Sequence, residues 1–189
     1  PSAEHSIVVD ACIAPEVKKC LIENGAYFMN ERESEALAEH CFCSNGSCKK
    51  HMVGQSAAAL AKRVGIPAGD RVTLLVAERK YVSISDPYCK GFLAPVLACY
   101  IEQDWEHACE KFIELLIHER NAHTLAIHSG NEVVIRQFAL KKPVGSLLVN
   151  TPAAFGGVGS STNLFPSMTH GSGSAGFGSP SVNVPPLTL

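Results

Sequence analysis

His123 is the residue of this sequence best suited by type and position to acid–base chemistry. It begins a short apolar segment directly after a polar loop. A neutral imidazole with a pKa of about 6.5 is what a general base at physiological pH requires. The pattern alone equally allows a surface histidine, or one whose hydrogen bonds are satisfied within the fold, and it does not decide between these roles.

A second group of candidate residues is rich in metal-binding side chains. Cys41, Cys43, Cys48 and His51 provide enough donors for a tetrahedral zinc site. Their spacing is not that of a standard zinc knuckle, and no second cysteine pair follows them. We therefore predict no metal and interpret the segment as an exposed loop with incidental thiols. A zinc site on these four residues stays as an alternative that metal analysis tests.

Two glycine patterns lie near the end of the sequence. Gly156, Gly157 and Gly159 follow a predicted strand, where glycine either lets the backbone approach a ligand or simply permits a turn. Gly171, Gly173 and Gly176 match the spacing of a dinucleotide-binding loop. That loop requires a strand before it, a helix after it and a later acidic residue, and these are missing here. We predict that the chain carries no nucleotide-binding fold of its own.

These residues must be positioned by alternating strands and helices. Short apolar runs predict strands, and apolar residues at helical spacing, bounded by Pro, Asp or Gly, predict helices. The predicted strands cover residues 7–11, 72–77, 95–101, 123–128 and 146–150, and the predicted helices cover residues 15–26, 33–41, 56–64, 105–117 and 131–140. Such alternation is typical of an α/β fold with a mainly parallel sheet flanked by helices.

Composition narrows the classes of function. The chain has 189 residues and a net charge of −2, which gives no reason to expect a nucleic acid as partner. No apolar run approaches the roughly 20 residues that span a bilayer, so we expect no membrane partner. The eight cysteines are spread along the chain, several of them in apolar patterns such as Cys20, Cys99 and Cys109. We predict reduced, mostly buried thiols and a cytoplasmic protein.

Residues 147–189 have the composition of a disordered tail but carry isolated apolar residues. Gly, Ser and Pro dominate the segment, and Phe155, Phe165 and Phe177 are among the apolar side chains placed within it. A solvated linker would have no use for them. We therefore predict an ordered, irregular segment that packs on another part of the protein or on a neighbouring subunit.

Three blocks of the sequence together resemble the CoA-acylating aldehyde dehydrogenases, including the aldehyde dehydrogenase half of the bifunctional aldehyde–alcohol dehydrogenases. Residues 4–10 are similar to the strand that follows the family's catalytic cysteine. The other two blocks are similar to the middle and the end of the catalytic domain, and a weaker fourth match covers residues 53–56. The middle block comprises residues 92–98, 105–108 and 123–124, and the last block comprises residues 148–159, 166–169 and 183–187.

This resemblance implies a two-step reaction. A cysteine thiolate attacks an aldehyde, hydride passes to a nicotinamide cofactor, and CoA takes the acyl group from the resulting thioester. It makes His123 the candidate general base and places Gly156, Gly157 and Gly159 in a loop near the active-site entrance. The nucleophilic cysteine would lie at or just before Pro1, so it is not among these residues. The family's ribose-binding glutamate is matched here by Gly91.

The resemblance also implies how the chain is organised. We expect residues 1–145 to form the catalytic domain, starting at or just after the nucleophile loop. Residues 146–189 would form a returning strand and an extended packing or oligomerisation segment. NAD and CoA would serve the complete enzyme, without tight binding to this part alone. The expected partners are the missing N-terminal nucleotide-binding half and further copies of the chain. The alternative is a non-catalytic structural or assembly module derived from the same fold.

Overall fold

A computed structural model describes residues 4–43, 48–89, 93–119, 124–141, 144 and 146–166. Contacts divide the chain into two compact units. One unit is His5–His118, and the other combines Pro1–Glu4 with Glu119–Leu189. The expected boundary at residue 145 falls inside the second unit.

The unit His5–His118 is built on a four-stranded sheet with the order β1-β4-β3-β2. All of its strand pairings are parallel. The strands are β1 (Ser6–Asp10), β2 (Ala26–Met29), β3 (Leu74–Arg79) and β4 (Val96–Glu102). The helices of the unit are α1 (Ala14–Glu23), α2 (Glu31–Cys41), η1 (Lys50–Met52), α3 (Ala57–Val64), η2 (Pro87–Cys89) and α4 (Trp105–Glu119). This arrangement confirms the predicted α/β class with a parallel sheet.

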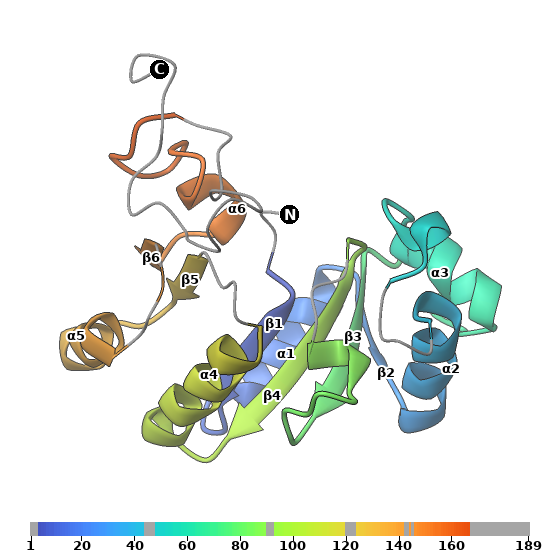
Figure 1. Ribbon diagram of the computed structural model, residues 1–189, viewed down its shortest axis with the longest axis horizontal. Coiled ribbons are helices and arrows are strands. Elements are labelled where there is room, and N and C mark those ends of the chain that lie inside the picture. Colours follow the sequence, from blue (N-terminus) through green and yellow to red (C-terminus); the bar gives the residue numbers. More distant parts are fainter. Residues whose placement is uncertain are drawn as a thin grey trace. The chain divides into compact units, whose positions relative to one another are not determined.

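Helices cover both faces of this sheet (Figure 1). On one face, Leu37 of α2, Leu60 of α3 and Leu115 of α4 pack with buried residues of the strands. On the other face, α1 packs against the sheet through Ala14, with Val17 and Leu21 at its edge. Because both faces are covered, β4 is buried from Val96 to Tyr100 and its sequence is a continuous apolar run.

The helix ends carry the local signals that define them. Asn30 and Glu33 form a capping box at the start of α2, each side chain accepting a hydrogen bond from the other's backbone N–H. Ser56 caps α3 by accepting a hydrogen bond from the Ala59 N–H at 3.2 Å. α3 then ends at Gly65, whose φ of 75° is left-handed.

One predicted helix is shorter than its sequence suggested. The helix expected over residues 15–26 ends at Glu23, because Asn24 and Gly25 terminate it. The φ of Gly25 is +92°, and a Cβ there would lie 2.8 Å from the Thr73 hydroxyl. The following residues, Ala26–Met29, form β2 and pair with β3. The prediction that the helix continued to about residue 26 is wrong, and β2 was not among the predicted strands.

The second unit contains a parallel pair of strands, β5 (Thr124–Ile127) and β6 (Ser146–Val149), joined through α5 (Glu132–Lys141). Leu125, Val134, Phe138 and Leu148 supply buried apolar side chains to these elements. A single helical turn, α6 (Ala153–Gly156), follows β6 in a stretch predicted to be irregular. No helix within the described ranges is long and apolar enough to cross a membrane.

Candidate active-site segments

The segment that follows β6 begins at Asn150, in a turn that is held by hydrogen bonds. Asn150 has a φ of 53°, a left-handed conformation that asparagine tolerates better than most residues. Its N–H donates to the carbonyl of Ile127 at 2.8 Å, and its side-chain oxygen accepts from the Ser129 N–H at 2.9 Å. Its side-chain amide donates to the Ser129 carbonyl at 3.1 Å. Asn150 thereby joins the carboxyl ends of β5 and β6, the edge where parallel α/β sheets hold their ligands.

Two of the three predicted glycine residues are required by the packing of this segment. A Cβ on Gly156 would lie 2.8 Å from side-chain atoms of both Leu148 and Thr151. Gly159 has a φ of +83°, and a Cβ there would lie 2.6 Å from the Leu164 carbonyl oxygen. Gly157 is buried but has an ordinary helical φ of −64°. The structure thus explains Gly156 and Gly159 by close packing, and their place beside a ligand stays a prediction.

Hydroxyl groups hold the same segment in a closed loop. Thr151, which is buried, forms a short hydrogen bond with the Ser161 hydroxyl. The Thr162 hydroxyl donates to the Gly156 carbonyl at 3.0 Å, and the Ser160 hydroxyl donates to the Phe155 carbonyl at 3.0 Å. We call residues 150–166 the glycine loop. Its conformation is fixed by its own short-range contacts.

One contact ties the glycine loop to the start of the chain. The Glu4 carboxylate accepts a hydrogen bond from the Ala153 N–H at 2.7 Å, although 149 positions separate the two residues. Glu4, the first residue of the first resembling block, therefore contacts the third block. Sequence patterns gave no indication of this contact, because nothing local relates the two positions.

His123 lies outside the described residues, as do Gly91 and the glycines at 171, 173 and 176. The role of His123 as base stays a prediction. The strand that it was predicted to begin is present as β5, which starts at the next residue, Thr124.

The cysteine-rich segment is only partly exposed. Cys43 and His51 are exposed, Cys48 is half-buried, and Cys41 is buried, which raises the pKa of its thiol to about 12. Phe42 and Cys48 form an antiparallel bridge. Among the described residues, no group of three or more His, Cys, Asp or Glu side chains could hold a metal ion. The zinc alternative stays a question for metal analysis.

The histidine beside this segment is unusual. His40 and His51 stack edge to face with their ring centroids 5.7 Å apart. The His40 Nε2 atom is buried and has no hydrogen-bond partner among the residues that the structure describes. Burial is the largest cause lowering the pKa of His40, and the nearby positive charges of His51, Lys49 and Arg63 lower it further.

None of the eight cysteines forms a disulfide in the part of the chain that the structure describes. Cys99 and Cys109 are buried, as their apolar patterns predicted, and burial raises the pKa of Cys99 to about 11. Cys20 is exposed on α1, so the prediction of burial is wrong for this residue.

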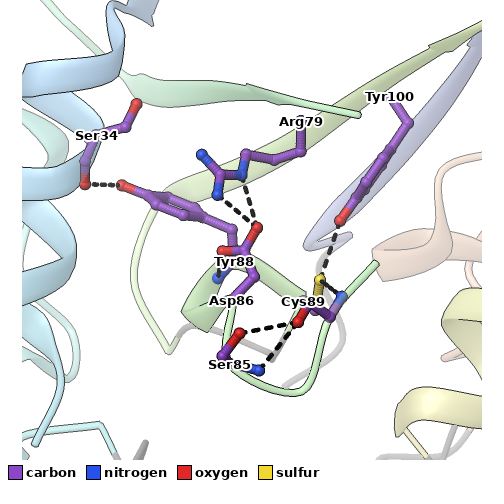
Figure 2. Close-up of polar contacts among 8 residues, drawn as sticks. Ser34, Arg79, Ser85, Asp86, Tyr88, Cys89 and Tyr100 are labelled. Atoms are coloured by element: carbon purple, nitrogen blue, oxygen red, sulfur yellow. Dashed lines mark hydrogen bonds and ion pairs between the residues drawn. The ribbon is translucent and has the colours of Figure 1, made fainter. Parts of the chain in front are cut away.

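A buried polar network holds the connection between β3 and β4 (Figure 2). Asp86 accepts hydrogen bonds from Arg79 Nε at 2.7 Å and from the Tyr88 N–H at 3.0 Å. The Tyr88 hydroxyl donates to the Ser34 carbonyl in α2 at 2.8 Å. The Cys89 thiol lies 3.4 Å from the Tyr100 hydroxyl of β4. Residues 79–89 are thus anchored to two strands and a helix, and sequence analysis missed all of these contacts.

The fold matches those of solved aldehyde dehydrogenases. A probable aldehyde dehydrogenase from Listeria monocytogenes has a TM-score of 0.91 and 40% identity, and the match covers 100% of this chain and 42% of that one. An acetylating aldehyde dehydrogenase from Geobacillus thermoglucosidasius has a TM-score of 0.88 and 37% identity, and the match covers 97% of this chain and 40% of that one.

Sequence comparison agrees with the fold. Over 193 residues the chain is 31% identical to the bifunctional aldehyde-alcohol dehydrogenase of Escherichia coli K12, a match that covers 100% of this chain and 22% of that protein. No protein-family model matches the sequence. The chain is a homologue of the acylating aldehyde dehydrogenases, and it spans between about a fifth and two-fifths of the relatives' length. The resemblance inferred from its motifs is confirmed.

Proposed function

We propose that this chain supplies the catalytic-domain part of a CoA-acylating aldehyde dehydrogenase, which converts an aldehyde, NAD and CoA to an acyl-CoA. One observation carries the proposal: the similarity to an acetylating aldehyde dehydrogenase at 37% identity over 97% of this chain. The meeting of Glu4 with the glycine loop supports it, because it brings together two of the sequence blocks on which the resemblance rests.

The proposed reaction divides one difficult oxidation into two easier steps. In the complete enzyme a cysteine sulfur would bond to the aldehyde carbon, and a nicotinamide cofactor held by the nucleotide-binding part would accept hydride from that carbon, leaving an acyl thioester. The CoA sulfur replaces the cysteine sulfur on the acyl carbon, and the cysteine leaves as thiolate. His123 is the proposed base that removes a proton from the cysteine or the CoA thiol.

The residues of this chain do not by themselves fit the nicotinamide cofactor. The position matched to the ribose-binding glutamate is Gly91, which offers no carboxylate. We therefore assign cofactor binding to a nucleotide-binding part beyond these residues and derive no step of hydride transfer from this chain. What the chain contributes is the base, the glycine loop and the scaffold that follows the nucleophile.

An activity assay tests the proposal. The purified 189-residue chain, given aldehyde, NAD and CoA, should form no NADH. The natural gene product that contains it should form NADH and acyl-CoA in equal amounts. NADH formation by the isolated chain, with full-length enzyme rigorously excluded, would refute the assignment of the nucleophile to a position outside it. The sequence of the gene upstream of Pro1 gives an independent check, because the proposal requires a cysteine there.

One observation favours the assembly alternative. Phe155 and Phe165, both on the glycine loop, are 60% and 66% exposed, and exposed aromatic side chains are enriched at protein interfaces. On this proposal the loop contacts another copy of the protein. Replacing both residues with Ser should lower the mass measured by light scattering in solution. An unchanged mass would argue against this role.

A further inference from the structure

Glu4 occupies a capping position that the local sequence cannot fill. Helix α6 begins after Pro152, which has no polar side chain and makes no capping hydrogen bond. The N–H groups of a first helical turn have no partner within the helix, so each needs another acceptor or water. Glu4 accepts from the first of them, the N–H of Ala153, at 2.7 Å. A residue from the start of the chain thus performs the task of an N-cap side chain.

The group that Glu4 holds is itself rigidly placed. Ala153 is 9% exposed, and the α6 turn ends at Gly156, which contacts Leu148 and Thr151 too closely to accept a larger side chain. The carbonyls of Phe155 and Gly156 accept hydroxyl groups of the glycine loop. The Ala153 N–H that binds Glu4 therefore cannot move without changing the conformation of the glycine loop.

We infer that Glu4 is a positioning residue for the nucleophile: its bond to Ala153 fixes the backbone leading to the catalytic cysteine against the glycine loop. This inference rests on the proposed function, in which the cysteine lies at or just before Pro1. A nucleophile gains most from being held in one orientation relative to the groups that act with it, and small displacements reduce rates strongly.

The charge of Glu4 has a separate effect on the proposed nucleophile. A carboxylate near a thiol disfavours the thiolate, because like charges raise the thiol pKa. The Ala153 N–H donates to that carboxylate, and a hydrogen bond to an ionised acceptor is stronger than one between neutral groups. Positioning needs only an acceptor oxygen, which glutamine also provides. The charge effect needs the carboxylate, so the two contributions can be separated by substitution.

The test compares Glu4→Ala and Glu4→Gln in the natural gene product, with Glu35→Ala as control. Glu35 is an exposed carboxylate on α2. The measurements are kcat for acyl-CoA formation and the rate of cysteine alkylation by iodoacetamide as a function of pH. We expect Glu4→Ala to lower kcat at least tenfold. Glu4→Gln should stay within about threefold of the parent enzyme, with an alkylation profile moved to lower pH because the negative charge is gone.

A second measurement uses the 189-residue chain alone and needs no activity. Amide exchange at Ala153 should be slow in the parent chain and about tenfold or more faster in Glu4→Ala, as the loss of a hydrogen bond to a charged group implies. An unchanged exchange rate at Ala153 in Glu4→Ala would show that Glu4 does not bind this N–H.

Unchanged kcat in Glu4→Ala, or equal losses in the Ala and Gln variants, would overturn the positioning role. A parent enzyme without aldehyde-oxidising activity would instead refute the proposed function. In that case the exchange measurement still decides whether Glu4 anchors the loop.

Discussion

Substitution of Asp86 tests whether the buried network of Figure 2 determines the stability of the sheet unit. Asp86 is 8% exposed and accepts from Arg79 Nε and from the Tyr88 N–H, and Arg79 NH2 lies 2.6 Å from the same carboxylate. Asp86→Ala removes the only carboxylate that this network places against the Arg79 guanidinium, and it removes the acceptor of the Tyr88 N–H. The Arg79 side chain keeps 28% of its surface in water, which moderates the loss.

The magnitude follows from these contacts. Removing one partner of a fully buried ion pair costs about 3–5 kcal/mol, and because Arg79 reaches water we take the lower end, about 3 kcal/mol. For a chain of this length, such a loss lowers the melting temperature by about 6–12 °C. Urea unfolding followed by circular dichroism measures the free energy directly, and the slope m should not change.

Two further variants make the test specific. Glu23→Ala removes the exposed pair Lys19–Glu23, whose charged atoms are 3.9 Å apart, and should cost no more than about 0.5 kcal/mol. Arg79→Met in the Asp86→Ala background removes the uncompensated charge, so the double variant should be less destabilised than the sum of the single changes by about 1 kcal/mol or more. Strict additivity, or a loss for Asp86→Ala as small as that for Glu23→Ala, would refute the reasoning.

The remaining predictions concern the glycine loop, His40 and the proposed base. Gly159→Ala should destabilise the chain more than Gly65→Ala, as measured by thermal unfolding of the two variants. Both glycines have a positive φ, which strains an alanine by about 1 kcal/mol, but only at residue 159 would the added Cβ also lie 2.6 Å from a carbonyl oxygen. The pKa of His40 in the folded chain is lowered from 6.5, so below that pH the unfolded chain binds more protons than the folded chain. The free energy of unfolding should therefore be highest above about pH 6.5 and should decrease as the pH falls toward the pKa of the folded chain. In His40→Gln the difference between the free energies of unfolding at pH 5 and pH 7, measured by urea titration, should be smaller. The same difference in both proteins would show that His40 does not cause the pH dependence. His123→Ala in the complete enzyme should lower the acylation rate by about 10²–10⁴-fold, and an unchanged rate across pH would reject its role as base.

Elements with strong periodic signals could be predicted from the sequence. The apolar run of residues 95–101 and the helical spacing from Trp105 correspond to β4 and α4. Ser56 and Gly65 bound α3 with side-chain and φ preferences that operate locally. In each case the determining physics lies within a few residues, so the sequence alone carries it.

The elements that were not predicted lack such local signals. β2 has four residues, and its apolar side chains continue the spacing of α1, so only the Asn24–Gly25 stop distinguishes strand from helix. α6 is one turn long and lacks a capping side chain of its own.

The contacts of the glycine loop could not be predicted from the sequence. Gly156, Gly157 and Gly159 were singled out because they follow a predicted strand, and their place in a site stays a prediction. The bond from Ala153 to Glu4 joins positions 149 residues apart. The pairing of Arg79 with Asp86 likewise depends on a turn whose geometry comes from packing against β4 and α2. Long-range hydrogen bonds of this kind leave no periodic trace in a sequence.

Trapping the acyl-enzyme tests the central claim most directly. The natural gene product is incubated with acetaldehyde and NAD in the absence of CoA, and its mass is measured before and after CoA is added. We predict an acetyl adduct on the cysteine that immediately precedes the segment containing Glu4, and its loss as acetyl-CoA when CoA is supplied. An adduct elsewhere, or an acyl group released as free acid at a rate that CoA does not change, would contradict it.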